Sequence, residues 1–352
     1  MELNVSLFKF YQSLCNSFLS FLQKYQSFCK TNQSSPFPNQ SPQKLNQSLR
    51  KTNRKQWVLI VFYDFQLKLL KNNWKRAGFN KQRKGNTLQR ELRTEGFLKN
   101  EDVIEFQKRF GEAMLTSKTL QGFCCVKPHG YSGDFEIIDK IYTNSITEDS
   151  KFSKWDYFFH TLAACKAVRN RKDYFKQLLK TKANDINILN LASGPCRDMI
   201  EYLEENPKSE ISFDCVELDT NAIEYGKNLL NKSTIKQTKI NFINKNIFKF
   251  DTSKEYDLIW SAGLFDYFED KVFIRLLKRF LKNIRTDGEL VIGNFHPKNP
   301  SKAYMEFGFW YLNHRTEEDL IKLAHACGIE DKNIDIKSES EGVNLFLHIS
   351  KT

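Results

Sequence analysis

The residues best suited to binding chemistry lie in one loop and at the end of the strand expected after it. The segment 188–198 reads ILNLASGPCRD, in which alternating apolar residues give way to Ala-Ser-Gly-Pro and then to a helical pattern. A loop with small side chains at a strand end lets a ligand lie against the backbone. Glu217 follows Gly194 by 23 residues, near the end of the next expected strand. Because a carboxylate there accepts hydrogen bonds from both hydroxyls of an unphosphorylated ribose, the pair predicts a nucleoside site.

Two phosphate-binding alternatives do not fit this loop. A Walker loop needs GxxxxGK[ST], and no Lys-Ser or Lys-Thr follows Gly194. A dinucleotide fingerprint needs GxGxxG, and the loop has a single glycine. Neither a triphosphate nor a pyrophosphate ligand is therefore supported.

A second group of reactive side chains lies in residues 127–134, which read KPHGYSGD. Lys127, His129 and Tyr131 can hold a carboxylate or assist catalysis, and the two glycines permit a close approach of the backbone. Asp134 can orient the Tyr or the Lys, or bind an ammonium group. The alternative is a rigid turn between helices. We favour a lid or ligand-facing loop.

His296 is the remaining catalytic candidate. It follows the fifth expected strand in the sequence GNFHP, at the edge where open α/β sheets bind ligands. It can serve as a base for a hydroxyl nucleophile or as a structural donor. Arg315, which precedes an expected helix, is a further candidate for contact with a substrate carboxylate.

Alternating strand and helix patterns must position these groups. The expected strands are Ile186–Leu191, Ser212–Glu217, Lys239–Asn244, Tyr256–Trp260 and Glu289–Asn294. Helices fit between them at 196–205, 220–231 and 266–285, and the rest predicts a helix at 316–327 and a hairpin of strands at 333–338 and 343–349. The pattern predicts an α/β fold: a Rossmann-like sheet of seven strands with helices on both faces. An amphipathic helix is expected at 101–122.

The loop and acid resemble those of class I S-adenosylmethionine-dependent methyltransferases, over residues 183–352. The resemblance implies that the methionine part of the cofactor lies over the first loop and that Glu217 binds the ribose. It places the adenine near Asn246 and Ile247. The cofactor-binding candidates in this domain are Ala192, Ser193, Gly194, Pro195, Glu217, Leu218, Asn246, Ile247, Ser261 and Gly263. Asp134, outside the domain, is a further candidate that would bind the cofactor's ammonium group. Ala192 and Cys196 stand where most members have glycine.

KPHGYSGD, the segment SAGLFDY at 261–267 and GNFHPKNP at 293–300 together look like a narrower bacterial subfamily. That subfamily is named for making 3-hydroxypalmitic acid methyl ester, an extracellular quorum-sensing factor. The resemblance then covers about 120–352, and ASGP is within the range of the subfamily's first loops. It implies O-methylation of a small lipid-like acid. Lys127, His129, Tyr131 and His296 are the catalytic candidates that their side-chain chemistry offers for this reaction. An already ionised carboxylate nucleophile needs no general base.

Net charge is unevenly distributed along the chain. Residues 1–126 hold 21 Lys and Arg against 8 Asp and Glu, a net +13, and the remainder holds 33 against 34, a net −1. We expect an amphipathic helix at 1–30, a linker at 31–50, a basic helical region at 51–120, a helical lid or substrate region at 121–182 and the methyltransferase domain at 183–352. The basic part suits a membrane surface or another anionic partner. We predict a cytoplasmic protein, or one peripheral at the inner membrane surface.

Other function classes have weaker signals. The eight cysteines form no CxxC pair and no His stands at zinc spacing, so we expect reduced thiols and no metal. A nucleic-acid methyltransferase is an alternative suggested by the basic N-terminal part. However, 261–264 reads SAGL instead of Asn/Asp-Pro-Pro-Tyr, which makes a nucleic-acid partner the lesser hypothesis. A non-catalytic cofactor-binding interaction module is the other alternative.

Overall fold

The computed structural model describes residues 104, 107–108 and 110–351. The described residues belong to the second of two units into which the chain divides, residues 103–352. The predictions for the helix at 1–30, the linker at 31–50 and most of the basic region at 51–120 fall outside the described residues. In the part of the chain described here, no helix has both the length and the apolar character needed to cross a membrane.

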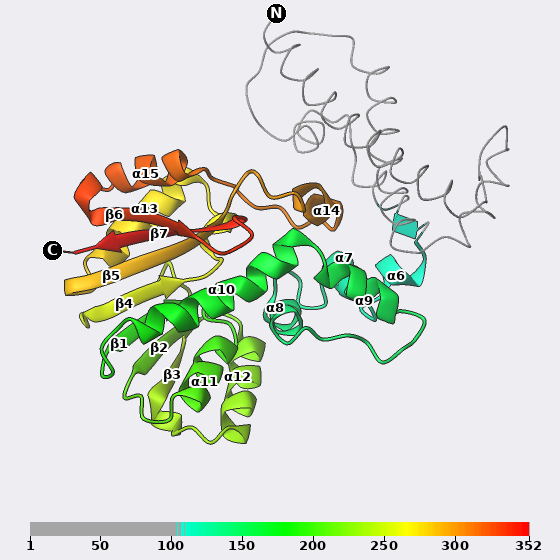
Figure 1. Ribbon diagram of the computed structural model, residues 1–352, viewed down its shortest axis with the longest axis horizontal. Coiled ribbons are helices and arrows are strands. Elements are labelled where there is room, and N and C mark those ends of the chain that lie inside the picture. Colours follow the sequence, from blue (N-terminus) through cyan, green and yellow to red (C-terminus); the bar gives the residue numbers. More distant parts are fainter. Residues whose placement is uncertain (1–103, 105–106, 109, 352) are drawn as a thin grey trace, which may run out of the picture. The chain divides into compact units, whose positions relative to one another are not determined.

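A single seven-stranded sheet forms the centre of this unit, with the strand order β3-β2-β1-β4-β5-β7-β6 (Figure 1). The strands are β1 (Asn187–Leu191), β2 (Ser212–Glu217), β3 (Ile240–Asn244), β4 (Tyr256–Ser261), β5 (Ile284–Phe295), β6 (Ile334–Ser338) and β7 (Asn344–Ser350). β1 to β5 pair in parallel, whereas β7 runs antiparallel to β5 and to β6. The chain order reverses between β1 and β4, which is where open α/β sheets bind ligands.

Helices cover both faces of the sheet (Figure 1). These helices are α10 (Ala163–Lys180), α11 (Arg197–Glu205), α12 (Thr220–Lys232), α13 (Asp270–Leu281) and α15 (Glu317–His325). On one face Phe175 of α10 and Met199 of α11 join a buried cluster with Trp260 of β4. On the other face, Leu277 of α13 and Leu320 of α15 join a cluster with strand residues. The burial of both faces confirms the predicted fold class and stabilises a parallel sheet.

Short helices before the sheet build the wall above its carboxyl edge. They are α6 (Glu112–Leu115), α7 (Leu120–Val126), α8 (Phe135–Tyr142) and α9 (Ser153–His160), with α14 (Lys302–Phe307) from the later part of the chain. Phe123 of α7 and Ile137 of α8 share a buried cluster with Phe295 of β5 and Trp310. This part of the chain therefore packs directly on the end of the sheet.

The single helix expected at 101–122 is wrong. α6 begins after Gly111, whose φ of 58° is left-handed, and ends after one turn. Thr119 then starts α7, because its side-chain oxygen accepts a hydrogen bond from Gly122 N at 2.9 Å. The apolar spacing continues through this break, so periodicity alone did not reveal the cap.

The fifth strand is longer than expected, and the helix before it is shorter. α13 ends at Leu281 instead of 285, after a separate 3₁₀ turn at Phe265–Tyr267. β5 begins at Ile284, which pairs with Tyr256 of β4. The polar residues Arg285, Thr286 and Asp287 hide this start, because they break the apolar run that predicts a buried strand.

Candidate functional site

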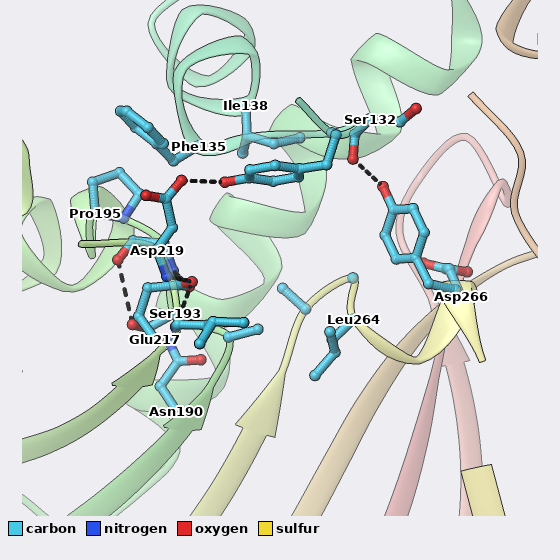
Figure 2. A pocket seen from close by; sticks show the side chains of 18 of the residues that line it. Ser132, Phe135, Ile138, Asn190, Ser193, Pro195, Glu217, Asp219, Leu264 and Asp266 are labelled. Carbon is cyan, nitrogen blue, oxygen red and sulfur yellow. Dashed lines mark hydrogen bonds between the residues drawn. The ribbon is translucent and has the colours of Figure 1, made fainter. Parts of the chain in front are cut away.

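A cavity of about 640 Å³ opens at the carboxyl ends of β1, β2 and β4. This volume lies within the range of small-molecule pockets. In Figure 2, Glu217 and Asp219 lie at one side of the cavity and Asp266 at the other, with Phe135 and Ile138 above them. The cavity is therefore bounded by the sheet edge below and by α8 and the segment before it above.

The loop from Ala192 to Cys196 approaches the cavity with an unusual backbone. Ala192, Gly194 and Cys196 have φ values of 55°, 56° and 60°, so three of its five residues are left-handed. The N–H of Ala192 donates to Val216 O at 2.9 Å, which fixes the start of the loop against β2. A Cβ built on Gly194 meets nothing within 4 Å. The glycine therefore leaves open space at a position where other residues would place a side chain.

Glu217 is held in place by backbone amides. Its Oε2 accepts from Gly194 N at 2.9 Å, and its Oε1 accepts from Leu218 N at 2.8 Å and Asp219 N at 2.9 Å. An ionised carboxylate has about four acceptor directions, so about one remains, on Oε2. The protein thus fixes this carboxylate next to the loop and leaves it able to accept a further hydrogen bond.

Tyr131, Ser132 and Gly133 line the cavity from above, and we refer to the segment that carries them, residues 127–134, as the roof segment. Tyr131 Oη donates to Asp219 Oδ2 at 2.7 Å, which joins the roof segment to Asp219, the residue immediately before α12. Ser132 O accepts from Tyr267 Oη at 2.9 Å, and Ser132 Oγ donates to Phe309 O at 3.0 Å. Burial, followed by the hydrogen bond to Asp219, raises the pKa of the Tyr131 hydroxyl. Tyr131 is therefore a neutral donor here.

The cavity also contains buried ionisable groups. Asp198, Asp266 and Arg171 line it, and their side chains are 6%, 1% and 6% exposed. Burial raises the pKa of Asp198 to about 6 and that of Asp266 to about 7. Asp266 Oδ1 accepts from Phe295 N at 2.7 Å, which lowers its pKa by less than burial raises it. Burial works against the charge of Arg171, but Tyr142 and the two carboxyls outweigh it and raise its pKa.

Most of the residues predicted for the site lie on the cavity wall. Those that line it are Tyr131, Ala192, Ser193, Gly194, Pro195, Glu217, Leu218, Asn246, Ile247 and Gly263. The structure brings them together from five separate segments of the chain. Their contacts with a cofactor or substrate remain predictions.

Five predicted residues do not line the cavity. Lys127 Nζ donates to Phe309 O at 2.9 Å, and burial lowers its pKa. His129 contacts Glu136 at 2.9 Å. Asp134 caps α8 by accepting from Glu136 N and Ile137 N. The other two, Ser261 and His296, are buried.

Ser261 and His296 are buried in the sheet unit. Ser261 Oγ donates to Leu191 O at 3.2 Å. His296 Nε2 lies 3.2 Å from Glu317 Oε2, and its Nδ1 accepts from Lys298 N. Each of these two side chains therefore makes a contact within the sheet unit. Arg315, the further candidate for contact with a substrate carboxylate, is hydrogen-bonded to Asp270 and Asn294.

Four charged residues that line the cavity carry no signal in the sequence. They are Asp139, Arg171, Asp198 and Asp266, and only their burial in the fold distinguishes them from surface charges. Within the described residues, no group of three or more potential ligands is placed to hold a metal ion.

Comparisons with known proteins identify the fold. No family model and no curated protein matches the sequence. A solved structure from Bordetella parapertussis, described as a possible exported protein, has 17% identity and a TM-score of 0.59, and the match covers 70% of this chain and 88% of that chain. At this identity the likeness shows the fold alone.

Two methyltransferases are also similar in structure. One is 1,6-didemethyltoxoflavin-N1-methyltransferase of Burkholderia thailandensis with bound S-adenosylhomocysteine, at 18% identity and a TM-score of 0.40, covering 53% of this chain and 78% of that chain. The other is magnesium protoporphyrin IX methyltransferase of Synechocystis PCC 6803 with bound S-adenosylhomocysteine. It has 10% identity and a TM-score of 0.43, and the match covers 54% of this chain and 87% of that chain.

Proposed function

We propose that the chain is an S-adenosylmethionine-dependent methyltransferase that O-methylates the carboxylate of a small lipid-like acid, such as a hydroxy fatty acid. The observation that carries the proposal is the open space at Gly194 beside the fixed carboxylate of Glu217, at the edge of the sheet where chain order reverses. This arrangement fits a nucleoside with free ribose hydroxyls.

The residues present fit the cofactor at its nucleoside end. Glu217 would accept from a ribose hydroxyl through its remaining acceptor direction, and the backbone of the 192–196 loop would lie against the rest of the ligand. Asn246 and Ile247 line the cavity after β3 and would contact the base. The roof segment, which Tyr131 fastens to Asp219, would exclude water from above.

The opposite end of the cavity suits an amphiphilic acceptor. Val168, Phe295, Trp310 and Leu312 line it and are all buried apolar side chains. Burying one methylene of an acyl chain against such a wall stabilises the complex by about 0.8 kcal/mol. The apolar wall therefore favours a lipid-like acid over a nucleic acid.

The transfer needs orientation more than proton chemistry. When bound, S-adenosylmethionine supplies a methyl group whose bond to sulfur breaks as a bond to the acceptor oxygen forms, leaving a neutral thioether and a neutral ester. A carboxylate acceptor loses no proton in this step. The protein's part is to hold the acceptor in line, which lowers a barrier by about 7–11 kcal/mol in well-oriented intramolecular reactions.

Binding of S-adenosylhomocysteine, measured by calorimetry on the full chain, tests the cofactor assignment. Glu217→Ala removes the ribose acceptor and should weaken binding by roughly tenfold or more. Glu224→Ala removes the same charge from an exposed position on α12 that does not line the cavity, and should leave binding unchanged. Equal affinities of the wild type and Glu217→Ala would contradict the ribose assignment.

Transfer of labelled methyl groups tests the acceptor. Wild-type chain is incubated with labelled cofactor and, separately, with hydroxy fatty acids or total RNA. The proposal expects label in an ester that alkali hydrolyses. Label in RNA would instead favour the nucleic-acid hypothesis, and label in neither, with cofactor bound, would favour a binding module.

A further inference from the structure

The guanidinium of Arg171 is a buried cation facing the cavity. Arg171 lies on α10, the helix that leads into β1, and its side chain is 6% exposed. Its Nη1 donates to Ala262 O at 3.2 Å, and its Nε donates to Tyr142 Oη at 3.4 Å. The Tyr142 ring centroid lies 6.0 Å from the guanidinium carbon. The second terminal nitrogen, Nη2, makes no hydrogen bond with the described residues.

No ion pair neutralises this cation within the described part of the chain. Asp198 and Asp266 act on it electrostatically, but neither forms a hydrogen bond or a salt bridge with it. Arg315 is a useful comparison, because it is equally buried yet bonded to Asp270, to Asn294 and to two backbone carbonyls. Buried charges in proteins are almost always paired. Arg171 has no such carboxylate partner among the described residues, whereas Arg315 has Asp270.

The surroundings make room for the guanidinium at the cavity wall. Gly263 leaves room for it, since a Cβ on that glycine would lie 2.6 Å from Nη1. Arg171 and Gly263 both line the cavity, as do the loop at Ala192 and the apolar residue Val168. The cation therefore faces the same cavity as the loop expected to hold the nucleoside and as the apolar wall.

We infer that Arg171 is an anchor for a carboxylate bound inside the cavity. The inference rests on the proposed function for the identity of the ligands. A guanidinium presents two parallel N–H donors that match the two oxygens of a carboxylate, and this pairing is strongest where water is excluded. Two carboxylates are available in the proposed reaction: that of the amino acid end of the cofactor and that of the lipid-like acid.

Four ligands distinguish these sources on the full chain. S-adenosylhomocysteine carries the amino acid carboxylate, and 5′-methylthioadenosine lacks it. A straight-chain fatty acid carries the other carboxylate, and the alcohol of the same chain length lacks it. The variants are Arg171→Met, which removes the charge, and Arg171→Lys, which keeps the charge without the planar fork. Arg169→Met on the same helix is the control, because Arg169 contacts His160 and does not line the cavity.

Arg171→Met is expected to lose at least tenfold in affinity for one carboxylate-bearing ligand and nothing for its carboxylate-free partner. A loss confined to S-adenosylhomocysteine assigns the anchor to the cofactor, and a loss confined to the fatty acid assigns it to the substrate. Arg171→Lys should fall between the wild type and Arg171→Met. Arg169→Met should match the wild type.

The inference is overturned if Arg171→Met binds all four ligands as the wild type does. It is also overturned by a uniform loss across the four ligands together with a lower unfolding temperature, which marks a structural residue. A wild-type chain that binds neither adenosine compound refutes the proposed function instead. The acid and alcohol pair still tests Arg171 in that case.

Discussion

Replacing Asp266 with Asn tests how strongly the cavity wall disfavours a negative charge. Burial raises the pKa of Asp266 from its ordinary value of 3.8 to about 7, against the opposing effects of Phe295 N, Arg171 and Arg315. Below about pH 4 the carboxyl is protonated in the folded and the unfolded chain, so it adds no pH dependence. As the pH rises from 4 to 7 the unfolded chain releases this proton first. The folded state therefore loses stability over that range, and the loss is complete above about pH 7.

The size of this effect follows from the two pKa values. A shift from 3.8 to about 7 corresponds to about 4 kcal/mol at 1.36 kcal/mol for each pH unit. Asn keeps an oxygen that can accept from Phe295 N but carries no charge. The free energy of unfolding of Asp266→Asn relative to the wild type should therefore rise by about 4 kcal/mol between pH 4 and pH 8. A constant offset from packing would not change with pH.

Urea denaturation at constant ionic strength, repeated at pH 4, 5, 6, 7 and 8, measures this difference. Asp173→Asn is the matched control, because Asp173 is exposed on α10 and does not line the cavity. A difference between Asp266→Asn and the wild type that stays within about 1 kcal/mol across this range would refute the burial argument. The same result would remove Asp266 from any account of acid–base chemistry in the cavity.

Two further predictions concern the walls of the cavity. Gly194→Ala and Gly130→Ala both place a Cβ at a left-handed φ, of +56° and +84°, in open space, and each should lower stability by about 1–2 kcal/mol. Only Gly194→Ala should also abolish binding of S-adenosylhomocysteine in calorimetry, because Gly194 lines the cavity and Gly130 does not. Equal binding by the two variants would show that the ligand does not lie over the loop at residues 192–196. Tyr131→Phe should weaken the same binding by roughly fivefold or less, because it removes one partly exposed hydrogen bond that holds the roof segment to Asp219. Tyr157→Phe, at a 56% exposed tyrosine away from the cavity, is its control, and an equal effect of both variants would contradict the role of the roof segment.

The sequence predicts the sheet well, because buried strands and amphipathic helices have strong periodic patterns. The alternation before Ala192 and the hairpin around Gly342 correctly predict β1 and the pair β6 and β7. The errors occur where a cap or a pairing partner overrides the pattern. Thr119 starts a new helix inside a continuous apolar spacing, and Ile284 joins β5 to β4 ahead of a polar run.

The site was less predictable than the fold. A glycine loop and an acid at the next strand end are local signals, and they placed Gly194 and Glu217 on the cavity wall. The importance of Arg171 and Asp266 comes from their burial, which depends on packing between segments about 90 residues apart. His296 shows the limit of a signal read from a strand end: it follows β5 directly, yet its ring is buried near Glu317, which only the packing reveals, and its role as a base stays a prediction.

The position of β7 inside the sheet has a consequence for synthesis of the protein. β7 follows β6 along the chain, yet it lies between β5 and β6. While the nascent chain leaves the ribosome, β5 has a bare edge until residues 344–350 have emerged. Phe295, whose ring lines the cavity, pairs with Asn344 at that edge. The cavity therefore reaches its final form only after this late strand has been inserted, and until then the exposed edge of β5 is open to pairing with other chains.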